Sequence, residues 1–168
     1  MNYKVLSTSK SLINVISSEE SEAVGYLLGK NLNPGFTVLL YGTLGAGKTQ
    51  LTKGIGRALG VKNIKSPSFI IVSEHESHPP LIHVDLYRLE KEIEVDFLDL
   101  ENYIEQECIL IVEWAEKWNT LFKKDAFKIK IEKNSKSDDG RQITIEAIGD
   151  AAIRILARIN LALEEVNK

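Results

Sequence analysis

The chain has 168 residues, 43% hydrophobic and 27% charged, which is typical of one globular domain over residues 1–168. Its formal net charge of −3 argues against a protein that holds nucleic acid through its overall electrostatic field. With one cysteine, no signal-peptide run after Met1 and no apolar run longer than Cys108 to Val112, disulfides and membrane insertion are excluded, so we expect a cytoplasmic protein.

Four elements are predicted in the first sixty residues. Ser17 and Glu20 have capping-box spacing, and the apolar positions after them predict a helix. The β-branched and aromatic run 36–41 predicts a buried strand. A glycine-rich loop, residues 42–49, follows directly, and helical spacing then continues to Gly60, where a left-handed residue can end the helix. The loop is therefore expected to join a strand to a helix.

Further apolar runs predict strands at 69–72, 81–84 and 108–112, with an acidic helical stretch between the last two. Strands that alternate with helices favour a mostly parallel sheet. Apolar and charged residues alternate at 127–132, which indicates a half-buried strand near an edge, and the alternation recurs at 143–147.

The last predicted helix begins at Asp150, which we expect to act as its cap. One stripe of this helix is apolar, and we interpret the stripe as core packing in preference to a partner-binding groove. Its members are Ala152, Leu156, Ile159, Leu163 and Val166.

The glycine-rich loop matches the phosphate-binding pattern GxxxxGK[ST] at every fixed position. Its glycines let successive backbone N–H groups face phosphate oxygens, and the following helix N-terminus adds positive potential. Lys48 is expected to reach the β- and γ-phosphates, and Thr49 to place its hydroxyl on Mg²⁺. The predicted fold is therefore α/β, a single-domain P-loop NTPase with a mostly parallel central sheet, flanking helices and added antiparallel edge strands. The nucleotide-binding residues expected here are Gly42, Gly45, Ala46, Gly47, Lys48, Thr49 and Gln50.

Two carboxylates follow predicted strands and could complete the site. Asp85 comes directly after the run 81–84, and Glu113 directly after 108–112. If these strands are parallel to 36–41, their carboxyl ends open on the same crevice as the loop. Either carboxylate could contact Mg²⁺ directly or through water. We assign catalysis to Lys48, Asp85 and Glu113, and metal binding to Thr49, Asp85 and Glu113.

Histidines and tryptophans offer weaker signals. With a single cysteine, a structural zinc site at His75, His78 and His83 is disfavoured, and we interpret these residues as loop and strand positions. Trp114 and Trp118 are more typical of core anchors, and Trp114 is the better candidate for stacking on a base or a partner.

Four segments occur together in an order and spacing that resemble the TsaE (YjeE) family. They are the phosphate loop, SPSF at 66–69, HVDLYR at 83–88 and VEW at 112–114. The resemblance extends from about Ser17 to about Ile145. It implies a bacterial ATPase that works with the TsaD and TsaB proteins to make threonylcarbamoyladenosine in tRNA, with tRNA contacted indirectly through the complex.

The resemblance also implies roles for individual residues. Mg-ATP would be the cofactor, Thr49 and Glu113 the magnesium site, and Asp85 an aid to hydrolysis. Residues 66–69 would respond to the γ-phosphate. The segment that contains Ser18 and Ser21 would approach the nucleoside, and Arg141 matches a family position near the nucleotide. Thr43 stands where the family usually has an acid.

Other functions of a phosphate loop remain as alternatives. A small-molecule kinase is disfavoured because the chain has no arginine-rich segment to form a lid, and a GTPase because no Asn-Lys-x-Asp motif occurs. A slow nucleotide-gated binding module overlaps with the family function. Without a lid, the site would need its partner to exclude water, so we expect weak hydrolysis alone and faster hydrolysis in a complex.

Overall fold

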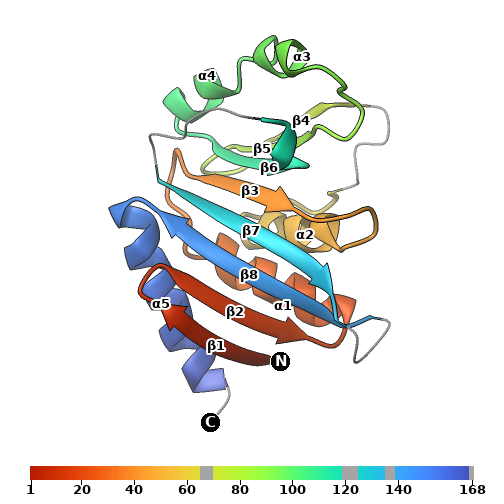
Figure 1. Cartoon of the computed structure of the whole chain (residues 1–168). Coiled ribbons are helices and arrows are strands. Elements are labelled where there is room, and N and C mark those ends of the chain that lie inside the picture. Colours follow the sequence, from red (N-terminus) through yellow and green to blue (C-terminus); the bar gives the residue numbers. More distant parts are fainter. Residues whose placement is uncertain (65–69, 119–124, 135–138, 167–168) are drawn as a thin grey trace.

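The structure is a computed structural model that describes residues 1–64, 70–118, 125–134 and 139–166. Its strands form one eight-stranded sheet with helices packed on it (Figure 1). The strands are β1 (Asn2–Ser7), β2 (Lys10–Val15), β3 (Thr37–Tyr41), β4 (Val72–His75), β5 (Leu81–Asp85), β6 (Ile109–Glu113), β7 (Ala126–Lys133) and β8 (Arg141–Ile148). The helices are α1 (Ser18–Gly29), α2 (Lys48–Ala58), α3 (Glu92–Asp96), α4 (Leu100–Glu105), α5 (Asp150–Val166) and the short 3₁₀ helix η1 (Ala115–Lys117).

The centre of the sheet is parallel and its flanks are antiparallel, which confirms the predicted fold class. The strand order is β1-β2-β8-β7-β3-β6-β5-β4. β7, β3, β6 and β5 pair in parallel, whereas β4 on one side and β8, β2 and β1 on the other are joined by antiparallel pairs. The carboxyl ends of β3, β5 and β6 therefore meet at one edge, where the glycine-rich loop begins.

Helices cover the two faces of the sheet unequally. α1, α2 and α5 pack on one face, and Val38 and Leu40 of β3 belong to the apolar cluster beneath them. Leu39 points to the opposite face, where the segment with α3 and α4 covers β5 and β6. Farther along that face, Lys128 and Lys130 are exposed. In α5, the described side chains of the predicted stripe, from Ala152 to Leu163, lie in the larger cluster, which confirms their interpretation as core.

The strand predicted at 69–72 was misplaced. Ile70 and Ile71 precede β4, which begins at Val72 and pairs antiparallel with β5; residue 69 lies outside the described residues. Ile70 is exposed, and the Ile71 carbonyl accepts a single hydrogen bond from the Asp85 N–H at 2.9 Å. Backbone pairing at a sheet edge needs no apolar run. The apolar residues therefore predicted a strand that ends at Val72, whereas the observed strand begins there.

The prediction of an edge position for β7 was also wrong. β7 lies between β3 and β8, and the hairpin of β1 and β2, which sequence patterns did not reveal, extends the sheet beyond them. The alternation of apolar and charged residues indicates that one face of β7 is exposed to solvent, but it does not indicate how many strands lie on either side of β7. In β2, Ser11 is fully buried and bonds Asn160 at 2.8 Å while Leu12 faces outward, so the apolar pattern there is misleading.

A different residue caps the last helix. Asp150 is the first residue of α5, and the N–H groups of Ala151 and Ala152 donate to the carboxylate of Asp125, at 2.8 and 3.2 Å. The first helical turn leaves backbone donors unpaired, and a carboxylate from the chain before β7 satisfies two of them. The prediction of Asp150 as the cap was therefore wrong.

α1 and α2 touch each other backbone to backbone. A Cβ placed on Gly25 would lie 2.1 Å from the Leu51 carbonyl oxygen, and one on Gly54 would lie 2.0 Å from the Glu22 carbonyl oxygen. Only glycine permits this approach, because any larger side chain would push the helices apart. The crossing fixes α2, and with it the loop at its N-terminus, against α1.

No helix in the described ranges is long and apolar enough to cross a bilayer.

Candidate functional site

The glycine-rich loop adopts a conformation that requires glycine at three positions. Gly42, Gly45 and Gly47 have φ angles of 149°, 75° and 106°, which side chains disfavour. At Gly42 a Cβ would also lie 2.5 Å from the Ile131 carbonyl oxygen, whereas around Gly45 there is open space. The loop thus curves tightly off β3 and presents an open surface at its turn. α2 begins at Lys48, so its N-terminus adds positive potential there.

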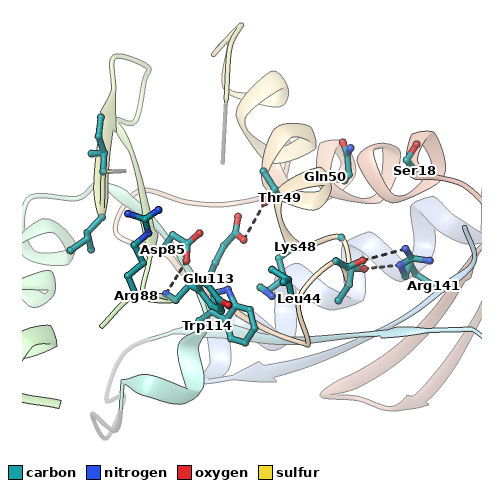
Figure 2. A pocket seen from close by; sticks show the side chains of 16 residues that line it. Ser18, Leu44, Lys48, Thr49, Gln50, Asp85, Arg88, Glu113, Trp114 and Arg141 are labelled. Atoms are coloured by element: carbon teal, nitrogen blue, oxygen red, sulfur yellow. Dashed lines mark hydrogen bonds between the residues drawn. The ribbon is translucent and has the colours of Figure 1, made fainter. Parts of the chain in front are cut away.

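A cavity of about 540 Å³ opens beside this loop (Figure 2). This volume is in the range of small-molecule sites. It brings together most of the residues that the sequence singled out: Ser18, Gly45, Ala46, Gly47, Lys48, Thr49, Gln50, Asp85, Glu113 and Arg141. Gly42 lies outside the lining, at the start of the loop. Ser21 is buried and its hydroxyl donates to the Ser17 carbonyl at 3.2 Å, while the segment 66–69 lies outside the described residues.

Lys48 is held by the loop to which it belongs. Its Nζ donates to the carbonyl oxygens of Gly42 at 2.7 Å and Thr43 at 3.2 Å, and it lies 3.8 Å from the centre of the Trp114 ring. Burial lowers the pKa of Lys48, and the charge of Glu113 opposes that shift. Phosphate oxygens are stronger acceptors than carbonyls, so the amine can exchange these partners for an anion that enters the cavity.

The two predicted carboxylates stand side by side at the carboxyl ends of neighbouring parallel strands. Asp85 of β5 is directly opposite Glu113 of β6 in register. Glu113 Oε2 accepts a hydrogen bond from the Thr49 hydroxyl at 3.2 Å, and Asp85 Oδ1 accepts one from the Tyr87 N–H at 2.9 Å. Burial raises the pKa of Asp85. The hydrogen bond from the Tyr87 N–H opposes this rise, and the negative charge of Glu113 adds to it.

These oxygens suit a magnesium ion that also binds phosphate. Mg²⁺ prefers hard oxygen ligands and is commonly held by one or two carboxylates together with substrate phosphates. The Thr49 hydroxyl and the Glu113 carboxylate lie 3.2 Å from each other beside the loop, and Asp85 lines the same cavity. Within the described part of the chain, no three His, Cys, Asp or Glu side chains are grouped to hold a metal without such a ligand.

The structure places Trp118 in the core and Trp114 and His83 at the site. Trp118 lies in the core, as interpreted, whereas Trp114 adopts a left-handed conformation (φ 60°) and lines the cavity. Its ring contacts the Lys48 amine and lies 4.8 Å from the ring of Tyr87, centre to centre. His83, interpreted as a strand residue, is buried against Glu113. The signal that could have revealed it is the two-residue spacing from Asp85, which places both on one face of β5.

Arg141 lines the same cavity and is hydrogen-bonded to the phosphate loop. From β8, its Nε donates to the Ala46 carbonyl at 2.8 Å and its guanidinium reaches the Gly45 carbonyl at 3.3 Å (Figure 2). In a planar peptide the carbonyl and the following N–H point in opposite directions. By holding the Ala46 carbonyl, Arg141 turns the Gly47 N–H away from itself. The family resemblance implied a position near the nucleotide for Arg141, and the structure shows it hydrogen-bonded to the loop.

If the loop binds the phosphates of a nucleotide, replacing Arg141 by alanine should weaken ADP binding by about tenfold, since a charge-assisted contact that fixes the loop contributes about 1.5–3 kcal/mol. Arg141→Lys should restore only part of the affinity, because a single ammonium cannot reproduce a planar fork of donors. Titration calorimetry in the presence of Mg²⁺ would measure both. Arg154→Ala, a change on the exposed side of α5, is the matched control. Full affinity in Arg141→Ala would show that the loop needs no such support.

Comparisons with known proteins identify relatives of this chain. The family described as "Threonylcarbamoyl adenosine biosynthesis protein TsaE" matches residues 15–143. A protein of Streptomyces coelicolor named tRNA threonylcarbamoyladenosine biosynthesis protein TsaE is 37% identical over 134 residues, 76% of this chain and 90% of that protein. The protein of the same name in Bacillus subtilis is 36% identical over 137 residues, 80% of this chain and 84% of that protein.

A crystal structure has a similar fold. YdiB of Bacillus subtilis superposes with a TM-score of 0.77 at 28% identity, over 91% of this chain and 95% of that chain. The similarity therefore extends over nearly the whole sheet and its helices.

Proposed function

The chain belongs to the TsaE family of tRNA threonylcarbamoyladenosine biosynthesis, and on that basis we propose that it binds Mg-ATP and hydrolyses it to drive this modification. The family relationship gives the pathway but leaves the chemistry of this chain open. One observation carries the proposal: a phosphate-binding loop, a hydroxyl and two carboxylates line a single cavity.

The loop and Lys48 supply the means to bind a polyphosphate. Open space at Gly45 leaves room for a ligand, and the N-terminus of α2 and the Lys48 amine favour negative charge there. ATP is the preferred nucleotide because the sequence contains no Asn-Lys-x-Asp motif for reading guanine. Ser18 and Gln50 line the cavity beyond the loop, where they could contact the nucleoside.

Hydrolysis needs a metal site and a group that orients water. Thr49 and Glu113 would hold Mg²⁺, which when bound would neutralise charge on the β- and γ-phosphates. Asp85 is next to Glu113 in register but bonds a backbone N–H through Oδ1. Its raised pKa makes its carboxylate a stronger proton acceptor than an ordinary aspartate, so we assign Asp85 to the attacking water.

Protein partners are expected to cover the cavity. Three apolar side chains at its mouth are largely exposed: Leu44 at 70%, Ile70 at 61% and Tyr87 at 49%. Exposed apolar side chains clustered around a polar site are typical of a surface that another protein covers. We propose TsaD and TsaB as these partners, from the family relationship, with tRNA contacted through them.

Hydrolysis by the isolated chain should be slow, and addition of TsaD and TsaB should raise kcat at least about tenfold, because closing a site excludes water and adds fixed charges. Phosphate release by the chain alone and by the mixture would measure this. A mixture with Lys48→Ala controls for hydrolysis by the partners. Equal rates with and without the partners would contradict the proposal.

The contact at the cavity mouth can be tested in the same assay. Leu44→Ser, which removes the exposed apolar side chain without adding a charge beside the loop, should change ADP affinity little, but it should remove most of the acceleration. Association of TsaD and TsaB with the chain should differ between ATP and ADP in a pull-down. Nucleotide-independent association would argue for a permanent assembly instead.

A further inference from the structure

We propose that His83 is a positioning residue that anchors one oxygen of Glu113, so that the other oxygen stays turned toward Thr49 and the cavity. This inference rests on the proposed function, in which Glu113 and Thr49 hold Mg²⁺. It assigns a role to a buried polar residue that the phosphate loop and the two carboxylates leave unexplained.

Strand register brings the two side chains together. His83 is opposite Ile111 in the parallel pair of β5 and β6, and Glu113 follows Ile111 by two residues. The period of a strand is two residues, so both side chains point to the face that α2 covers. His83 Nε2 lies 2.9 Å from Glu113 Oε1, with the two residues 0% and 2% exposed. The contact is therefore shielded from water.

The two oxygens of Glu113 have separate partners. Oε1 receives His83 at 2.9 Å and the Thr52 hydroxyl at 3.3 Å, whereas Oε2 receives the Thr49 hydroxyl at 3.2 Å. Thr52 is three residues after Thr49 and so lies on the same side of α2. The Thr52 hydroxyl is also 3.1 Å from the Lys48 carbonyl, so its one hydrogen is shared between two acceptors. His83 is therefore the closer partner of Oε1 and contacts no other acceptor through Nε2 in the described structure. Oε1 is thus anchored inside the protein and Oε2 is left for the cavity.

The surroundings of His83 indicate that this contact is its purpose. The other residues of β5 from Leu81 to Val84 are apolar and buried, and an aliphatic side chain at position 83 would avoid the cost of burying an imidazole. Nδ1 is buried without a hydrogen-bond partner among the residues that the structure describes. Since a carboxylate oxygen can only accept, Nε2 is the donor in this contact. Only the nitrogen that faces Glu113 is used.

Side chains that orient metal ligands typically change metal affinity or activity by about 10–100-fold when they are removed. We call the ratio of ADP affinity with Mg²⁺ to ADP affinity in EDTA the magnesium gain. His83→Leu should therefore leave ADP affinity in EDTA within about twofold of wild type and reduce the magnesium gain by about tenfold or more. His83→Gln should recover most of that gain, because its amide nitrogen can reach the position of Nε2. Titration calorimetry with Mg²⁺ and with EDTA would give both numbers.

His75→Leu is the matched control. His75 ends the neighbouring strand β4, and its Nε2 is likewise buried and unpartnered in the described structure, but its register partner is Leu81 rather than a site residue. We expect its magnesium gain to equal that of wild type. Thermal melts of all variants would show whether they fold. If His83→Leu does not fold, NMR of the wild-type chain, which reports the nitrogen that carries the His83 hydrogen, carries the test.

A second measurement needs neither metal nor nucleotide. Nitrogen NMR of the free protein should show His83 with its hydrogen on Nε2, and Glu113→Ala should remove the protection of that hydrogen from exchange with water. An Nδ1–H tautomer would overturn the inference.

Three outcomes of the calorimetry are distinguishable. An unchanged magnesium gain in folded His83→Leu would refute the positioning role and leave the proposed function intact. A loss of affinity that is equal with Mg²⁺ and with EDTA, without rescue by glutamine, would show a purely structural role and also refute it. Absence of any magnesium gain in wild type would refute the proposed function itself.

Discussion

Lys48→Ala should lower the affinity for ADP and ATP by at least about 100-fold, which in practice abolishes binding. The amine is the only side-chain cation that the described loop itself contributes to the cavity. Charge-assisted hydrogen bonds contribute about 1.5–3 kcal/mol each, and the amine would make at least two with phosphate oxygens. The same change frees the carbonyls of Gly42 and Thr43, so the loop also loses an internal tether.

Titration calorimetry would measure the loss, with circular dichroism to confirm that the variant folds. Lys53→Ala is the control: Lys53 lies on the same helix but lines a separate hollow near the end of α2. Its affinity should equal that of wild type. Retention of affinity in Lys48→Ala would remove the basis for assigning phosphate to this loop.

Glu113→Gln should reduce hydrolysis by about 100-fold and remove most of the effect of Mg²⁺ on nucleotide affinity, because the amide keeps the shape of the side chain but loses the charge. Affinity in EDTA should change little. Glutamine is preferable to alanine because the carboxylate accepts hydrogen bonds from Thr49, Thr52 and His83, and truncation would leave several buried donors unpaired.

Phosphate release and calorimetry with Mg²⁺ or EDTA would separate these effects. Glu116→Gln, three residues along the chain and exposed, controls for the loss of one negative charge near the loop. A Glu113→Gln protein that hydrolyses ATP at the wild-type rate would exclude Glu113 from the metal site. The result would then favour Asp85, which the sequence offered equally.

The sequence was most informative where local chemistry permits few solutions. The pattern from Gly42 to Thr49 requires a strand before it and a helix after it, and the structure has both in β3 and α2. Asp85 and Glu113 could be placed at strand ends because apolar runs stop there. Periodicity does not indicate which distant segments pair. It therefore could not predict that these strands are neighbours or that the two residues are register partners.

Other features depended on contacts that leave no local pattern. The attachment of Arg141 to the loop joins residues 95 positions apart, and His83 resembles any polar residue in a strand until β6 is placed beside it. The hairpin of β1 and β2 was missed because its buried positions include Ser11 while Leu12 faces outward. In each case the determining partner was far away in the chain.

The attachment of β8 to both the loop and the N-terminal hairpin has a consequence for synthesis on the ribosome. The first sixty residues contain the entire phosphate loop, but β3 lies between β7 and β6, and β2 has β8 on the side away from β1. These pairings can form only after residues 109–148 have been synthesised. Arg141, which steadies the loop, is translated almost a hundred residues after it. Long-range pairings of this kind form late in folding. A nascent chain that ends before residue 141 therefore carries the motif without its support, and under the proposed function it should bind nucleotide about tenfold more weakly than the finished protein.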